Sequence, residues 1–124
     1  MKHRWIGRNI DLEKLAKNIV KFFEKLNFKA KKERKLKTIT LNFKTVDKGK
    51  TRCIIIKITG KPSDFTISFE NPFEHDLFLE NTFFWQFMGA GFLLLKKYED
   101  REFYQKIEEY FWCDIERIIA ECFL

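Results

Sequence analysis

Residues 38–70 carry the pattern that most constrains this fold, an alternation of apolar and polar side chains with a period of two. Segments 39–45 and 65–70 alternate in this way, and segment 52–59 between them is rich in β-branched residues. Such alternation is typical of strands with one buried face. Only residues 46–50 and 60–64 separate the three segments, and both stretches contain glycine. Connections this short make consecutive strands pair antiparallel.

Helical patterns flank this central region. Residues 12–26 place apolar side chains at helical spacing after Asp11, which is a good N-cap, and a final amphipathic helix follows Asp100. A short polar alternation over residues 28–33 adds one more strand. We therefore predict an α+β fold with an N-terminal helix, a four-stranded antiparallel meander, and two to three C-terminal helices packed on one sheet face. The remaining faces of the first helix hold Lys14, Lys17, Lys21 and Lys25.

The size and composition of the chain suit one folding unit. Its 124 residues are 45% hydrophobic, which is enough for a core without crosslinks. We expect residues 1–124 to form a single α+β domain in which residues 1–9 are a loosely ordered N-terminal arm. The odd number of cysteines, without CxxC spacing, favours a reducing compartment, and the start of the sequence has no apolar signal segment. We therefore expect a cytoplasmic protein.

A run without charged side chains covers residues 82–95. As a helix it would extend about 21 Å, which is short of the roughly 30 Å hydrocarbon core of a bilayer. A buried helix is therefore favoured, and no membrane insertion is expected. A helix that is apolar on nearly every face needs cover on several sides, and one small domain has limited interior. We predict a non-enzymatic binding protein that forms a homodimer through residues 83–95, with interface residues Phe84, Trp85, Met88 and Phe92.

Positive charge is concentrated in the first half of the chain. Residues 1–61 hold 19 Lys/Arg and 5 Asp/Glu, whereas residues 62–124 hold 5 and 13. The densest basic stretch, KAKKERKLK, covers residues 29–37. Lysine arrays attract phosphate backbones as point charges, although lysines also protect sheet edges from aggregation. The alternative function is nucleic-acid binding through a lysine-rich sheet face that contacts the backbone, with Lys29, Lys31, Lys32, Arg34, Lys35 and Lys37 as its residues.

The order of helix, antiparallel strands and helix resembles that of the double-stranded-RNA-binding domain and of the Alu-binding subunits of the signal recognition particle. The resemblance implies RNA binding only at the level of fold. The lysine cluster that the RNA-binding domain carries at its second helix has no counterpart here, because residues 71–80 are acidic. We therefore infer no family membership.

Catalytic and cofactor-binding motifs are absent from the sequence. His3 lies near the terminus, and His75 stands between Glu74 and Asp76, where neighbours on a helix point in different directions. Cys53 lacks an obvious histidine partner, and the other cysteines are best interpreted as small apolar residues. We expect no catalysis, cofactor or metal. A second alternative function is the binding of a small apolar ligand in a phenylalanine-lined cavity between the sheet and a helix.

The dimer hypothesis predicts a mass of two chains that falls toward one chain on dilution. Light scattering across a dilution series measures this, because apolar association follows mass action. A mass that stays at one chain over the whole series would rule out the dimer.

Overall fold

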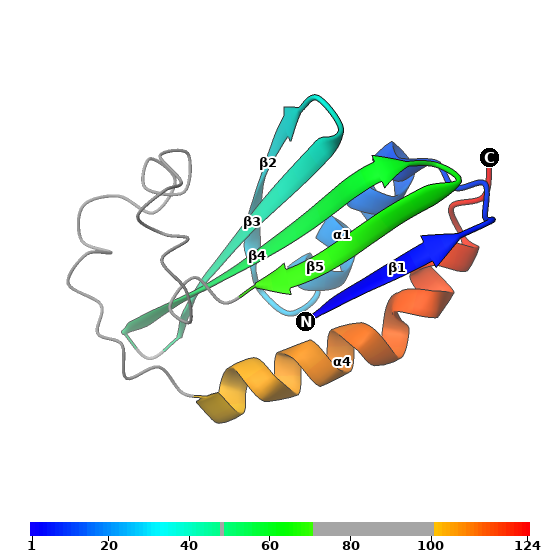
Figure 1. Cartoon of the computed structure of the whole chain (residues 1–124). Coiled ribbons are helices and arrows are strands. Elements are labelled where there is room, and N and C mark those ends of the chain that lie inside the picture. Colours follow the sequence, from blue (N-terminus) through cyan, green and yellow to red (C-terminus); the bar gives the residue numbers. More distant parts are fainter. Residues whose placement is uncertain (48, 71–100) are drawn as a thin grey trace.

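The computed structural model describes residues 1–47, 49–70 and 101–124, and these form one antiparallel sheet with two helices on the same face (Figure 1). The sheet order is β1-β5-β4-β3-β2. The chain order places one strand before the first helix and four after it. The strands are β1 (Lys2–Ile6), β2 (Lys29–Lys35), β3 (Thr38–Asp47), β4 (Lys50–Lys61) and β5 (Asp64–Glu70), and the helices are α1 (Leu12–Glu24) and α4 (Arg101–Ala120).

The α+β class and the antiparallel meander are confirmed, and the strand count is corrected from four to five. The additional strand is β1, which pairs antiparallel with β5 from Lys2 opposite Ser68 to Ile6 opposite Asp64. It lies within residues 1–9, where we expected a loosely ordered arm. Its partner β5 is about sixty positions away in the sequence, so no local sequence pattern predicts the pairing.

The described residues contain one C-terminal helix. In the described part of the chain only α4 follows the sheet, whereas the sequence predicted two to three helices there. The segment 82–95, in which we predicted an apolar helix, lies outside the described residues. None of the described helices is long and apolar enough to cross a bilayer.

Helix α1 begins where the sequence predicts. The Asp11 carboxylate accepts hydrogen bonds from the backbone N–H groups of Glu13 at 3.1 Å and Lys14 at 3.2 Å. This cap satisfies two of the amides that a helix N-terminus leaves without partners. The helix buries Leu15, Ile19 and Phe23 against the sheet and α4.

The core lies between the two helices and the inner face of the sheet. Each of the three central strands contributes alternate residues to it. Because the register pairs Phe43 with Ile54 and Leu41 with Ile56, these side chains share the inner face. The buried strand residues are Ile39, Leu41, Phe43, Ile54, Ile56, Ile58, Phe65, Ile67 and Phe69.

The turn from β4 to β5 depends on Gly60. Its φ angle is +120°, and an added Cβ would lie 2.3 Å from the Asp64 carbonyl oxygen. Its N–H donates to the Lys37 carbonyl at 3.0 Å, which ties this turn to the β2–β3 turn. Only glycine tolerates both this positive φ and the lack of space for a Cβ.

Replacing Gly60 with alanine is expected to lower the free energy of unfolding by about 3 kcal/mol or more, because strain and a backbone clash add together. Gly49→Ala is the matched control. Gly49 also has a positive φ, +79°, but has nothing within 4 Å of the added atom, so a loss of about 1 kcal/mol is expected. Chemical denaturation measures both, and equal losses would contradict this account of Gly60.

Candidate functional site

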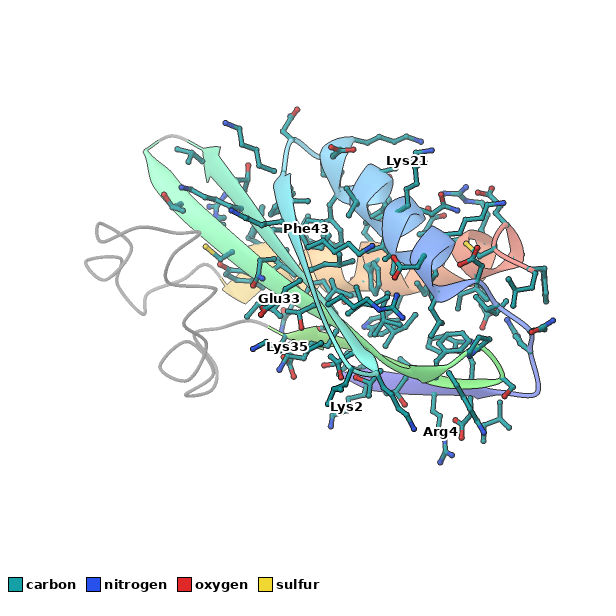
Figure 2. All side chains as sticks on the ribbon, turned by 90° about the horizontal axis from the view of Figure 1, so that it is seen from above. Lys2, Arg4, Lys21, Glu33, Lys35 and Phe43 are labelled. Carbon is teal, nitrogen blue, oxygen red and sulfur yellow. The ribbon has the colours of Figure 1, made fainter. Side chains whose placement is uncertain are left out.

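Four lysines form a continuous stripe along the solvent face of α1. Lys14, Lys17, Lys21 and Lys25, the last at the C-cap, follow one another at intervals of three or four residues, so their side chains leave the same side of the helix. All four are exposed. Figure 2 shows Lys21 on α1 away from the sheet, with Phe43 on the side where helix and sheet meet. We call these residues the α1 lysine stripe.

The stripe makes no ion pair with the described residues, whereas several other exposed cations do. Among the described residues, no carboxylate oxygen lies within 4.0 Å of any of its ammonium groups. By contrast, Arg4 pairs with Asp64 at 2.7 Å, and Arg8 pairs with Glu116 at 2.8 Å. Like charges one turn apart destabilise a helix by roughly 0.2–0.5 kcal/mol per pair. The stripe therefore lowers the stability of the fold. The role of these lysines is accordingly expected to lie outside folding.

The basic residues predicted from segment 29–37 do not share one face. Lys29, Lys31 and Lys35 project from the outer face of the sheet, and Lys35 pairs with Glu33 at 3.3 Å. Lys32 and Arg34 project from the inner face, because they stand opposite Leu41 and Ile39 of β3. Both form ion pairs with Glu13 of α1. Lys37 lies in the turn between β2 and β3.

The centre of the outer face is not an open lysine surface. Asn42, Cys53 and Ile55 point away from the two helices, and yet each is at most 1% exposed. Lys57 pairs there with Glu70 at 3.6 Å. The exposed cations of this face therefore lie around its margins. The basic residues that the sequence predicted on one sheet face are therefore distributed over separate parts of the surface.

Two grooves border the α1 lysine stripe. Toward the β2 edge, an open groove of about 640 Å³ is lined by Lys14, Lys17 and Lys21 of the stripe together with Lys32. Toward α4, a second groove of about 330 Å³ is lined by Lys21 and Lys25 together with Tyr110. The stripe thus forms the shared wall of two depressions, and its charges line both.

Several acidic side chains beside the stripe are held by other cations. Glu13 is paired with Lys32 and Arg34. In the α4 groove, Arg117 donates to Asp114 through Nε at 3.1 Å and to Glu121 at 3.2 Å. The hydrogen bond from Arg117 lowers the pKa of the Asp114 carboxyl below its usual value. These pairs engage three carboxylates near the stripe, and Lys25 adds a weaker attraction to Asp114, so the charge of the stripe is only partly compensated.

The other predicted site residues fall outside the described part of the chain or serve the core. Phe84, Trp85, Met88, Phe92 and His75 belong to the first group, so the predicted dimer interface stays a prediction. Within the described ranges, no group of three or more His, Cys, Asp or Glu side chains is arranged to hold a metal ion. The predicted phenylalanine-lined cavity adjoins the apolar segment 82–95 and also stays a prediction, whereas Phe23 in the described core stacks on Phe43 with ring centroids 4.2 Å apart.

The sequence pattern predicted these lysines on the polar faces of the first helix, and no site was predicted there. The signal was present, since intervals of three, four and four residues put all the lysines on one side of a helix. Tyr110 could not have been found in this way, because it reaches the stripe from α4 only after the chain has folded.

Comparison of the chain with protein-family models, with curated proteins and with solved structures gives no match in any of the three.

The reactivity of the three cysteine thiols allows a direct check of which of them the fold buries. Cys113 is exposed, whereas Cys53 and Cys122 are buried. Burial raises the pKa of the Cys122 thiol, and the hydrogen bond from Asn18 at 3.2 Å opposes that rise. A thiol reagent at about pH 8 should therefore modify one cysteine of the native protein rapidly. Cys113→Ser should abolish this fast phase, and a fast phase that survives the substitution would contradict the burial of the other two thiols.

Proposed function

We propose that this protein binds the phosphate backbone of nucleic acid through the α1 lysine stripe. One observation carries the proposal: four exposed lysines lie on one helix face, and no carboxylate oxygen of the described residues lies within 4.0 Å of their ammonium groups. A polyanion would supply the missing counter-charges and would release its condensed cations on binding.

The dimensions of the stripe support a backbone ligand. From Lys14 to Lys25 it extends about 16 Å, since each residue of a helix rises about 1.5 Å. Phosphates on one strand of B-DNA follow at about 3.4 Å along the axis, so the stripe can accompany about five of them. Lysine makes point-charge contacts rather than the bidentate contacts by which arginine reads bases. We therefore expect weak sequence preference.

Lys32 extends the positive surface beyond the helix. It lines the larger groove together with Lys14, Lys17 and Lys21, and its ion pair with Glu13 removes that carboxylate as a repelling charge. Of the β2 residues predicted from the sequence, Lys32 would contribute to this surface from the inner side of the sheet edge. The proposed interface is therefore the α1 lysine stripe together with Lys32.

Replacing Lys14, Lys17, Lys21 and Lys25 with glutamine should weaken binding to a duplex of random sequence. The slope of log K against log salt should become less steep by about 0.9 for each lost phosphate contact. Binding measured by fluorescence anisotropy over a salt series gives both quantities. Thermal unfolding of the variant should show no loss of stability, because the substitutions remove like-charge repulsion.

The matched control changes the same number of charges elsewhere. Lys2, Lys29, Lys37 and Lys61 are exposed residues of the strands and turns and do not belong to the stripe. Their replacement with glutamine lowers the net charge equally but should leave most of the salt slope in place. Equal loss in the two variants would mean that only net charge matters, and would refute a defined interface on α1.

Self-association through residues 83–95 is a second proposal, supported by the run of 14 residues without charge. It involves different residues from the stripe, so the dilution series tests it independently of nucleic-acid binding.

A further inference from the structure

The groove between α1 and α4 combines an aromatic ring with two lysines of the stripe. Tyr110 is 60% exposed although it lies on a helix that packs against the core. Its ring meets Phe22 edge to face, with centroids 5.9 Å apart, and Phe22 in turn contacts Phe111 at 5.9 Å. The tyrosine is therefore held in position by the core while most of its surface remains open. Lys21 and Lys25 line the same groove.

We propose that this groove receives an unstacked base, so that the preferred partner is single-stranded nucleic acid. The inference rests on the proposed function and specifies its ligand. Proteins that bind single strands place bases on aromatic rings while cations follow the backbone. Tyr110 supplies the ring, and the α1 lysine stripe supplies the cations. In a duplex the bases are stacked inside the helix and cannot reach such a groove.

The charges within the groove indicate which part of a nucleotide enters it. Asp114 and Glu121 line it and are paired with Arg117, so a phosphate placed there would have to compete with two carboxylates for that cation. A base is neutral, and its N–H groups can donate hydrogen bonds to such carboxylates. Leu26 and Ile118 add apolar lining. The base therefore fits inside the groove, and the phosphates fit outside it along the stripe.

This arrangement brings a ring to the basic surface from a distant part of the sequence. The outward positions of the strands hold no ring beside the lysines of segment 29–37, so sequence analysis predicted backbone contact alone. The structure places Tyr110 of α4 beside Lys21 and Lys25 of α1. Stacking accepts every base, so the expectation of weak sequence preference is kept.

The test compares three labelled probes of equal length by fluorescence anisotropy at one salt concentration: a single strand of thymidines, the same strand with abasic sites, and a duplex. The native protein should bind the thymidine strand about five- to a hundredfold more tightly than the abasic strand, because each stacked base contributes to affinity. The duplex should bind more weakly than the thymidine strand.

Substitutions at Tyr110 separate stacking from charge. Tyr110→Leu should remove most of the preference for bases and leave the salt slope unchanged, whereas Tyr110→Phe should keep the preference. The stripe variant should show the reverse, a less steep salt slope with the base preference retained in whatever binding remains. Because Tyr110 is exposed, both replacements should fold, and thermal unfolding verifies this.

The possible failures can be distinguished. If all three probes bind equally and Tyr110→Leu changes nothing, the base-binding groove is refuted while backbone binding stands. If none of the probes binds the native protein, the proposed function fails and the groove proposal fails with it.

Discussion

The packing of Phe23 is the interaction on which the rest of this structure depends. This fully buried ring of α1 stacks on Phe43 of the sheet at 4.2 Å and lies 5.8 Å from Phe111 of α4. It also contacts Phe28 at 5.5 Å, just before β2. One side chain therefore joins the sheet and both helices. It also fixes the rotation of α1, because a helix that points Phe23 inward must point the opposite face toward solvent.

The α1 lysine stripe is a consequence of that rotation. Lys21 precedes Phe23 by two positions and Lys25 follows it by two, and two positions on a helix lead to roughly the opposite face. Burial of the ring thus presents the lysines to solvent on a rigid element, and sites on rigid elements hold their geometry better than sites on loops. The packing of uncharged core residues therefore determines which way the lysines of α1 point.

The limits of the sequence prediction follow from the range of the interactions. The meander and the start of α1 depend on neighbouring residues, such as the cap from Asp11 to Glu13, and were predicted. The pairing of β1 with β5 and the approach of Tyr110 to Lys21 join distant segments, and no local pattern encodes them. The basic segment 29–37 is an intermediate case. Its alternation correctly indicated a strand, but the same alternation sends Lys31 to one face and Lys32 to the other.

The charge asymmetry between the two halves of the chain is partly satisfied within the molecule. Acidic residues of α4 pair with the N-terminal segment, as Glu116 does with Arg8 and Glu108 with the terminal amino group at 3.5 Å. The α1 lysine stripe has no such partners among the described residues, so its repulsion is offset by core packing around Phe23. A bound polyanion would relieve this repulsion. A ligand that binds only the folded state also stabilises it, so the feature that weakens the free protein would strengthen its complex.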